Sequence, residues 1–122
     1  YLKEKGIKTA VATSSGRQWT EQNVGGAGID GFFDAYAFGE MVTHAKPDPE
    51  IFLLTAEKLG VEPARCLVLE DSYNGVRAGA RGGFVTVMVP DLAPADDEMR
   101  SLYTAECRDL FEVKKLLEAG KL

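Results

Sequence analysis

Short apolar runs alternate with amphipathic stretches along most of the chain. The apolar runs predict buried strands at 7–13, 32–38, 66–69 and 84–89. Helical spacing of apolar residues, with glycine and proline at the expected ends, predicts helices at 17–27, 48–59, 73–82 and 110–117. Residues 91–98 form an acidic loop in this pattern. Because strands alternate with helices of about ten residues, we expect one α/β domain with a mostly parallel sheet built from β-α-β units.

Polar clusters fall where two of these strands end. Thr13-Ser14 follows one strand and Glu70-Asp71 follows another. In a parallel sheet, ligand-binding and catalytic residues usually lie at the edge formed by the carboxyl ends of the strands. Adjacent carboxylates repel each other, so they must be solvated, hydrogen-bonded or bound to a metal. As hard oxygen ligands they suit Mg²⁺. The alternative is an acidic loop that caps the following helix.

Thr13-Ser14 and Lys46 also allow two interpretations each. Hydroxyl and N–H groups in a loop that opens a helix can bind an anion, but a plain N-cap uses the same residues. Lys46 precedes Pro47 and Pro49, which stiffen the backbone and would present its ammonium in a fixed direction to a phosphoryl group. The alternative is an ordinary solvated lysine.

Composition and charge narrow the function classes. The 122 residues are 45% hydrophobic and 27% charged, which is typical of a soluble globular domain. With 19 acidic and 14 basic residues and a net charge of −5, the chain has no basic footprint, so we expect neither nucleic acid nor a membrane surface as a partner. Only Cys66 and Cys107 are present, which is too few for a disulfide framework, and we expect a cytoplasmic protein.

Three motifs in a fixed order give a family resemblance. A strand ends at Thr13, Lys46-Pro-Asp-Pro-Glu-Ile-Phe opens a helix 33 positions later, and Leu69-Glu-Asp-Ser-Tyr-Asn-Gly places Asp71 a further 25 positions on. This combination resembles the second, third and fourth motifs of the haloacid dehalogenase superfamily. More narrowly, it is similar to the branch of β-phosphoglucomutase and phosphoglycolate phosphatase-like proteins. The resemblance implies a Rossmann-like, three-layer α/β/α core.

The resemblance also implies a role for each motif residue. Thr13 and Ser14 would bind the phosphoryl group, and Lys46 would neutralise its charge, which makes Thr13 and Lys46 catalytic residues. Asp71 would hold Mg²⁺, with Glu70 as a second ligand. Two further residues, Ser72 and Asn74, would lie in the loop around that metal. The implied substrate is a small phosphorylated metabolite.

The family's first motif, Asp-x-Asp-Gly-Thr/Val, is not found in these residues. The stretches nearest to it, Asp30–Asp34 and Asp96-Asp97, lie at the wrong places relative to the other motifs. In the family this motif supplies the aspartate nucleophile at the end of a strand. The resemblance therefore implies that residues 1–122 are a partial core domain, with the nucleophile strand and a helical cap upstream. That strand would lie between the strands ending at Thr13 and Glu70. Without it we expect a gap in the sheet that the upstream N-terminal segment or a partner chain fills, or a rearranged strand pairing.

Taken together, the resemblance implies the core of a Mg²⁺-dependent hydrolase of phosphomonoesters, such as sugar phosphates, that works through an aspartyl-phosphate. Positioning and charge stabilisation by groups of these types are most of what phosphoryl transfer requires. We expect residues 1–122 alone to be inactive, because they lack the nucleophile. One alternative is a β-phosphoglucomutase-type mutase. Another is a non-catalytic module that binds phosphate or a protein partner.

Overall fold

The computed structural model describes all 122 residues. The strands are short and are listed with the helices in chain order. The elements are β1 (Ala10–Ala12), α1 (Arg17–Gly26), β2 (Ala35–Ala37), α2 (Glu50–Leu59), β3 (Leu67–Glu70), α3 (Tyr73–Arg81), β4 (Val85–Met88), α4 (Asp97–Leu102), β5 (Ala105–Glu106) and α5 (Leu110–Glu118). Three single 3₁₀ turns connect them: η1 (Asp30–Phe32), η2 (Gly39–Met41) and η3 (Pro63–Arg65). No helix is long and apolar enough to cross a membrane.

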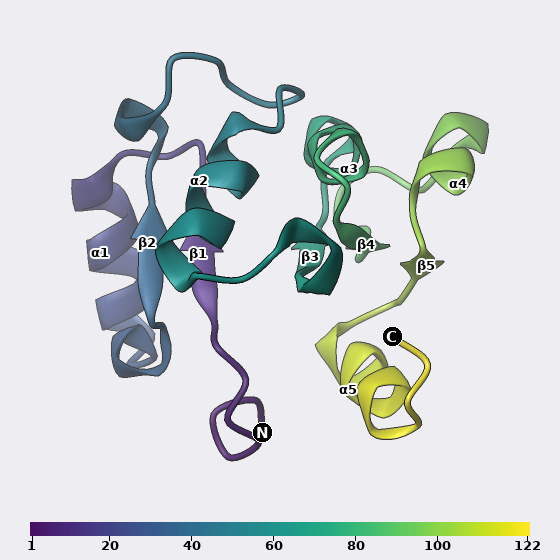
Figure 1. Cartoon of the computed structure of the whole chain (residues 1–122), viewed down its shortest axis with the longest axis horizontal. Coiled ribbons are helices and arrows are strands. Elements are labelled where there is room, and N and C mark those ends of the chain that lie inside the picture. The colour runs from purple at the N-terminus through teal and green to yellow at the C-terminus, as the bar shows by residue number, and fades with distance from the viewer.

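Every strand pairing in the molecule is parallel. β1 pairs with β2, and β3, β4 and β5 form a second sheet in that order. The registers bring Ala12 opposite Ala37 and Glu70 opposite Met88, so the carboxyl ends of paired strands lie level. This confirms the expected α/β class with parallel pairing. β1 and β3 are not hydrogen-bonded to each other, and each has one unpaired edge (Figure 1).

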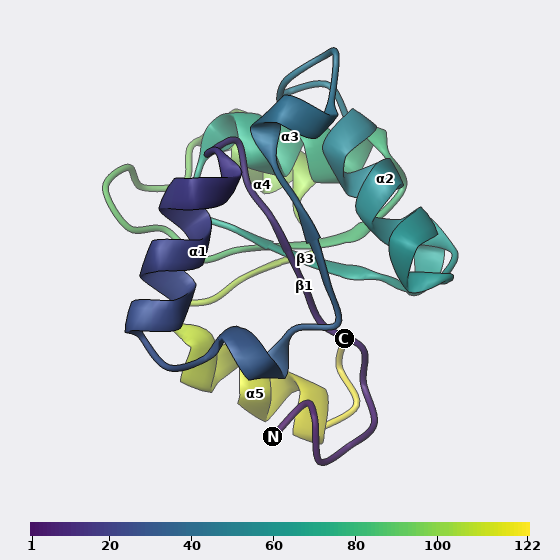
Figure 2. The ribbon, with the colours of Figure 1, turned by 90° about the vertical axis from the view of Figure 1, so that its left-hand side faces the viewer.

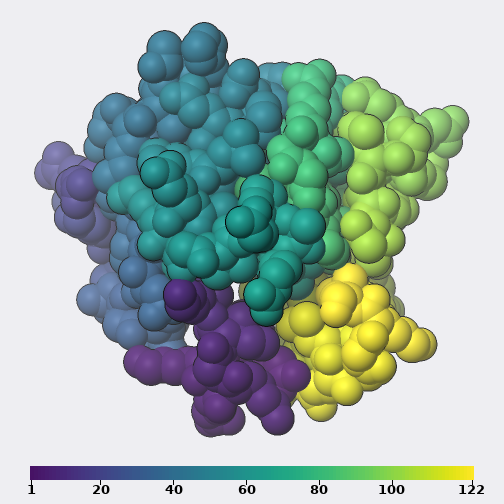
Figure 3. All heavy atoms as spheres, viewed as in Figure 1, coloured from purple at the N-terminus to yellow at the C-terminus, as the bar shows by residue number.

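Helices cover both faces of the strands. Figure 2 shows α2 and α3 on one side and α1 and α5 on the other, which is the expected three-layer arrangement. The first residues of the chain lie beside α5 (Figure 3), where the Lys114 ammonium is 5.2 Å from the centre of the Tyr1 ring.

Helix α2 holds the two sheets together. Its residues Ile51 and Phe52 are at most 6% exposed and belong to the same apolar cluster as Ala37 of β2 and Val68 of β3. The Phe52 ring meets the Phe84 ring edge-on at 5.9 Å between centres. Because both sheets bury apolar side chains against the same helix, their unpaired edges are held at a fixed separation by packing rather than by a hydrogen-bonded ladder.

The region after β4 differs from the sequence prediction. The acidic loop predicted at 91–98 gives way to helix α4, whose N-cap Asp96 accepts a hydrogen bond of 2.8 Å from the N–H of Met99. Met99 is fully buried against Val76 and Met88, and β5 then adds a fifth strand. The first part of the strand predicted at 32–38 is also different, because Phe32 ends a 3₁₀ turn and is 56% exposed.

Candidate functional site

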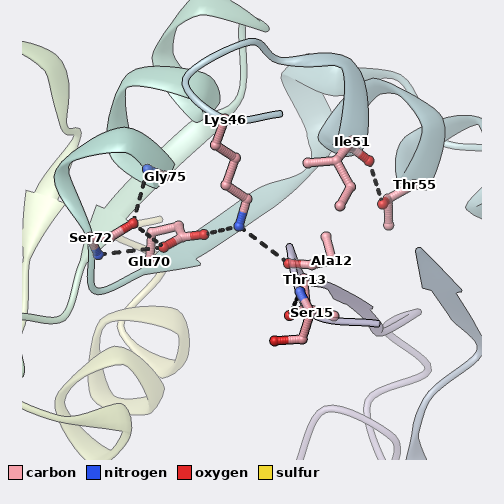
Figure 4. Close-up of polar contacts among 9 residues, drawn as sticks. All are labelled: Ala12, Thr13, Ser15, Lys46, Ile51, Thr55, Glu70, Ser72 and Gly75. Carbon is pink, nitrogen blue, oxygen red and sulfur yellow. Dashed lines mark hydrogen bonds and ion pairs between the residues drawn. The ribbon is translucent and has the colours of Figure 1, made fainter. Parts of the chain in front are cut away.

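The candidate residues gather where β1 and β3 end. Thr13 and Ser14 follow β1 directly, and Glu70 is the last residue of β3. The Lys46 side chain descends from the loop before α2 into the space between these two strand ends, as Figure 4 shows. The structure therefore places three motifs that are distant in sequence side by side at the carboxyl edge.

Lys46 connects the two sheets through its ammonium. Its Nζ donates to the carbonyl oxygen of Ala12 at 3.4 Å and to the Glu70 carboxylate, with which it forms an ion pair. The ammonium also lies over the Phe52 ring, 4.7 Å from its centre. The side chains of Lys46 and Glu70 are only 12% and 9% exposed. Lys46 is therefore a largely enclosed, oriented cation, which excludes the interpretation as a solvated surface lysine.

The Glu70 carboxylate is fixed from its other side by the start of α3. Ser72 is the N-cap of this helix, and its Oγ accepts from the N–H of Gly75 at 3.0 Å. The same hydroxyl donates to Glu70 at 3.2 Å. The backbone of Gly75 comes close, since a Cβ at this position would lie 2.0 Å from the Glu70 carboxyl carbon and would displace it. The close approach of the helix backbone thus leaves room for one carboxylate and directs it towards Lys46.

The loop after β1 presents unsatisfied donors. The Thr13 hydroxyl accepts from the N–H of Ser15 at 3.1 Å, which folds the loop back on itself. Ser14 is exposed, and neither its hydroxyl nor its N–H has a hydrogen-bond partner within the protein. Ser14 and Lys46 border a hollow of about 280 Å³, whose other lining residues are Gly39, Val42, Thr43, Ala45 and Ile51. The hollow therefore has free donors and a cation on its wall, which is the chemistry that an anion requires.

Asp71 and Asn74 lie differently from the other predicted residues. Asp71 is exposed, and its carboxylate has no hydrogen-bond or ion-pair partner. Asn74 accepts from the guanidinium of Arg77 at 2.9 Å, on the outer surface of α3. Thus Thr13, Ser14, Lys46 and Glu70 come together with Ser72, Asp71 stands next to them, and Asn74 is engaged elsewhere.

The carboxylates of Glu70 and Asp71 are ligands of the type that Mg²⁺ prefers, but they would provide only part of its coordination shell. No group of three or more His, Cys, Asp or Glu side chains is placed to hold a metal. Mg²⁺ is typically bound by one or two carboxylates with water and substrate phosphate completing its six ligands. Glu70 and Asp71 match that partial set by their chemistry.

Two contacts of Lys46 were not predicted from the sequence. The carbonyl of Ala12 gives no signal in a sequence, because every residue has one. Phe52 belongs to the apolar stripe of the helix predicted at 48–59, and a stripe residue is expected to fill the core. Its position six residues after Lys46, on the first turn of α2, is the only signal that its ring face meets the ammonium.

Comparison with known proteins now identifies the family. The sequence profile described as a hydrolase, haloacid dehalogenase-like, matches residues 1–83. The chain belongs to the haloacid dehalogenase-like hydrolase family. It is 40% identical over 83 residues to the phosphorylated carbohydrates phosphatase of Thermotoga maritima, a match that covers 68% of this chain. It is 33% identical over 118 residues to hexitol phosphatase B of Escherichia coli strain K12, covering 88% of this chain.

Solved structures of this hydrolase family share the fold. The crystal structure of CbbY from Rhodobacter sphaeroides in complex with phosphate superposes with a TM-score of 0.83 at 31% identity, covering 92% of this chain and 51% of CbbY. The matches cover 38% of the Thermotoga phosphatase and 52% of the hexitol phosphatase. The chain therefore spans about half the length, or less, of the relatives it matches.

Proposed function

We propose that this chain forms the phosphate-binding half of a Mg²⁺-dependent phosphomonoester hydrolase of the haloacid dehalogenase-like family. Its substrates would be sugar phosphates or similar small phosphorylated metabolites. One observation carries the proposal: a largely enclosed lysine stands between the ends of β1 and β3, beside a hollow with unpaired donors. The relatives named as phosphatases of carbohydrates and hexitols, and the phosphate held by CbbY, support it.

The hydrogen-bonding capacity of Lys46 suits a phosphoryl oxygen. A lysine ammonium has three N–H donors, and two of them are directed to Ala12 and Glu70. The third remains for a phosphoryl oxygen in the hollow, together with the hydroxyl and N–H of Ser14. Because these groups are fixed before the substrate arrives, they stabilise developing negative charge without reorganising. In this proposal Thr13 shapes the Ser14 loop and adds its hydroxyl to the same phosphoryl group.

Glu70 and Asp71 would hold the magnesium ion. When bound, Mg²⁺ would neutralise charge on the transferring phosphoryl group. Ser72 then orients Glu70 through its hydroxyl, so the loop that opens α3 positions the acidic pair. Asp71 is exposed and has no hydrogen-bond partner in the protein, so its carboxylate would be accessible to a metal ion arriving from solvent.

The nucleophile is proposed to be an aspartate upstream of Tyr1. Residues 1–122 contain no Asp-x-Asp-Gly motif, and the matches cover only 38% and 52% of the two phosphatase relatives. The unpaired edges of β1 and β3 offer a place for one additional parallel strand, whose carboxyl end would face Lys46. The aspartate carboxylate of this strand would attack the phosphorus in line and displace the substrate's alcohol oxygen, which takes up a proton as it leaves. Water would then hydrolyse the aspartyl-phosphate and release inorganic phosphate.

The test is phosphate release by the protein translated from its natural start codon. With Mg²⁺ and a panel of hexose and hexitol phosphates, we expect turnover that EDTA abolishes. Lys46→Ala should lower kcat by about 10²- to 10³-fold, the usual effect of losing one fixed charge-stabilising donor. Lys58→Ala, at an exposed lysine of α2 without ion-pair partners, is the matched control and should leave the rate unchanged.

Three results would change the proposal. Phosphate release by residues 1–122 alone would exclude an upstream nucleophile. Isomerisation of a sugar phosphate without net release would favour a mutase. Phosphate binding without any turnover by the natural-length protein would favour a non-catalytic module.

A further inference from the structure

The loop that carries Lys46 has few bonds of its own. Within residues 43–49, the one backbone–backbone hydrogen bond that joins two loop residues runs from the N–H of Asp48 to the carbonyl of Ala45 at 3.0 Å. The N–H groups of Thr43 and His44 have no backbone acceptor. Something other than the loop itself must therefore fix the backbone from which Lys46 extends.

Glu50 supplies the missing acceptors. Its Oε1 accepts from the N–H of Thr43 at 2.9 Å, and its Oε2 accepts from the N–H of His44 at 2.8 Å. The same Oε2 lies 3.1 Å from Nδ1 of His44. These N–H groups lower the pKa of the Glu50 carboxyl below its ordinary value, so the group is charged at neutral pH. One carboxylate thus accepts from both backbone N–H groups of Thr43 and His44.

Helix α2 consequently holds both ends of the Lys46 side chain. Glu50, its first residue, fixes the backbone two residues before Lys46, and Phe52, two residues later, lies under the ammonium. Asp48 adds a short link within the loop, because its Oδ1 accepts from the N–H of Glu50 at 2.9 Å. The helix itself is anchored in the core through Ile51 and Phe52. A rigid element therefore sets the position of the charge, while the loop only carries it.

We propose that Glu50 is a positioning residue for Lys46, acting by tying the backbone of Thr43 and His44 to the first turn of α2. This inference rests on the proposed function of Lys46 in binding the phosphoryl group. Glu50 touches neither Lys46 nor the hollow beside it. Its effect passes through the loop backbone, so its removal should displace the ammonium without removing any group of the site.

The experiment compares Glu50→Ala with two matched variants of the natural-length protein. Glu57→Ala removes an exposed glutamate without polar side-chain partners from the same helix. His44→Ala removes the imidazole and keeps both backbone bonds to Glu50. We expect Glu50→Ala to lower kcat about 10- to 100-fold with a smaller change in KM, as displacement of a reacting group by about 1 Å does. Glu50→Gln, which retains one good acceptor, should fall between, and both controls should match the wild type.

A second readout does not require turnover. Because the Lys46 ammonium lies over the Phe52 ring, NMR signals of the adjacent methylene should carry an upfield ring-current shift. We expect Glu50→Ala to lose this shift and to speed amide exchange at Thr43 and His44, while amides of β3 and β4 stay protected. Glu57→Ala should change neither.

The two readouts separate the two claims. A wild type without turnover would overturn the proposed function, and the Lys46 shift would still decide the positioning role. Full kcat in Glu50→Ala, or a Lys46 shift unchanged by that substitution, would overturn the role of Glu50. A loss of kcat in Glu57→Ala as large as that in Glu50→Ala would also overturn it, because the loss would then come from a less stable α2 rather than from the loop.

Discussion

Gly75 determines how much space the Glu70 carboxylate has. Gly75 has no side chain, and a Cβ there would overlap the carboxyl carbon of Glu70. Glu70 cannot swing away freely, since its carboxylate is held by Lys46 and Ser72 and is largely enclosed. A methyl group at position 75 therefore acts on the ion pair, and through it on the site.

Gly75→Ala should lower the free energy of unfolding, although alanine is the better helix former. Overpacking costs about 1–3 kcal/mol, whereas the helix propensity gained is about 1 kcal/mol. Urea denaturation of the wild type and of the variant measures the net change in the free energy of unfolding. Gly25→Ala is the control in α1, where nothing lies within 4 Å of the added methyl group, and it should be neutral or stabilising. Equal stabilisation by both substitutions would show that Glu70 is not held in place.

Sequence patterns predict individual residues well where chemistry is local. Thr13, Lys46 and Glu70 were predicted as neighbours because each belongs to a motif at a strand or helix end. Asn74 was predicted to lie in the loop around the metal, and in the structure its Oδ1 accepts a hydrogen bond from Arg77. The roles of Phe52 and Gly75 depend on how closely α2 and α3 approach the strand ends. The sequence pattern of one segment does not predict the distance between a helix and a distant strand.

At the scale of elements, helix α4 shows where periodicity fails. It has six residues, too few for an apolar stripe to be recognised, and its single fully buried side chain is Met99. Besides its N-cap Asp96, the helix is stabilised by tertiary contacts: Met99 packs on Val76, and the guanidinium of Arg77 forms two hydrogen bonds of 2.6 Å to Glu98. Such a helix is visible only once α3 is in place.

The pair between Arg77 and Glu98 gives α4 a pH-dependent anchor. The hydrogen bonds from Arg77 lower the pKa of Glu98 below its ordinary value. A carboxyl group whose pKa is lower in the folded state stabilises the fold at any pH above its unfolded pKa. That stabilisation is lost as the pH falls through the folded pKa.

We therefore expect Glu98→Gln to be less stable than the wild type at neutral pH. The difference should shrink as the pH falls below the usual range of a glutamate and vanish below the lowered folded pKa. Urea unfolding at a series of pH values measures it, with Glu57→Gln as a control that lacks an ion pair. Because the pair is partly exposed, 0.5 M salt should also weaken it. A difference between wild type and Glu98→Gln that is constant with pH would exclude this ion pair as the anchor.

At the scale of the whole molecule, helix α2 packs against both parallel sheets. The sequence predicted the α/β class, because alternating strands and helices have few other solutions. The strands divide into a two-stranded and a three-stranded sheet, because β1 and β3 are not hydrogen-bonded to each other. The apolar cluster under α2 contains residues of both sheets and holds them at a fixed separation.

The central claim is that this chain contributes one half of a phosphoryl-transfer site whose nucleophile is encoded upstream. In the hexitol phosphatase relative, the match covers 52% of the length, so about half of that protein lies outside the match. The most direct measurement is to sequence the coding DNA that precedes the codon for Tyr1. We expect an in-frame Asp-x-Asp-Gly motif upstream, followed by helical cap sequence. A start codon directly before Tyr1, or an upstream frame without that motif, would contradict the account.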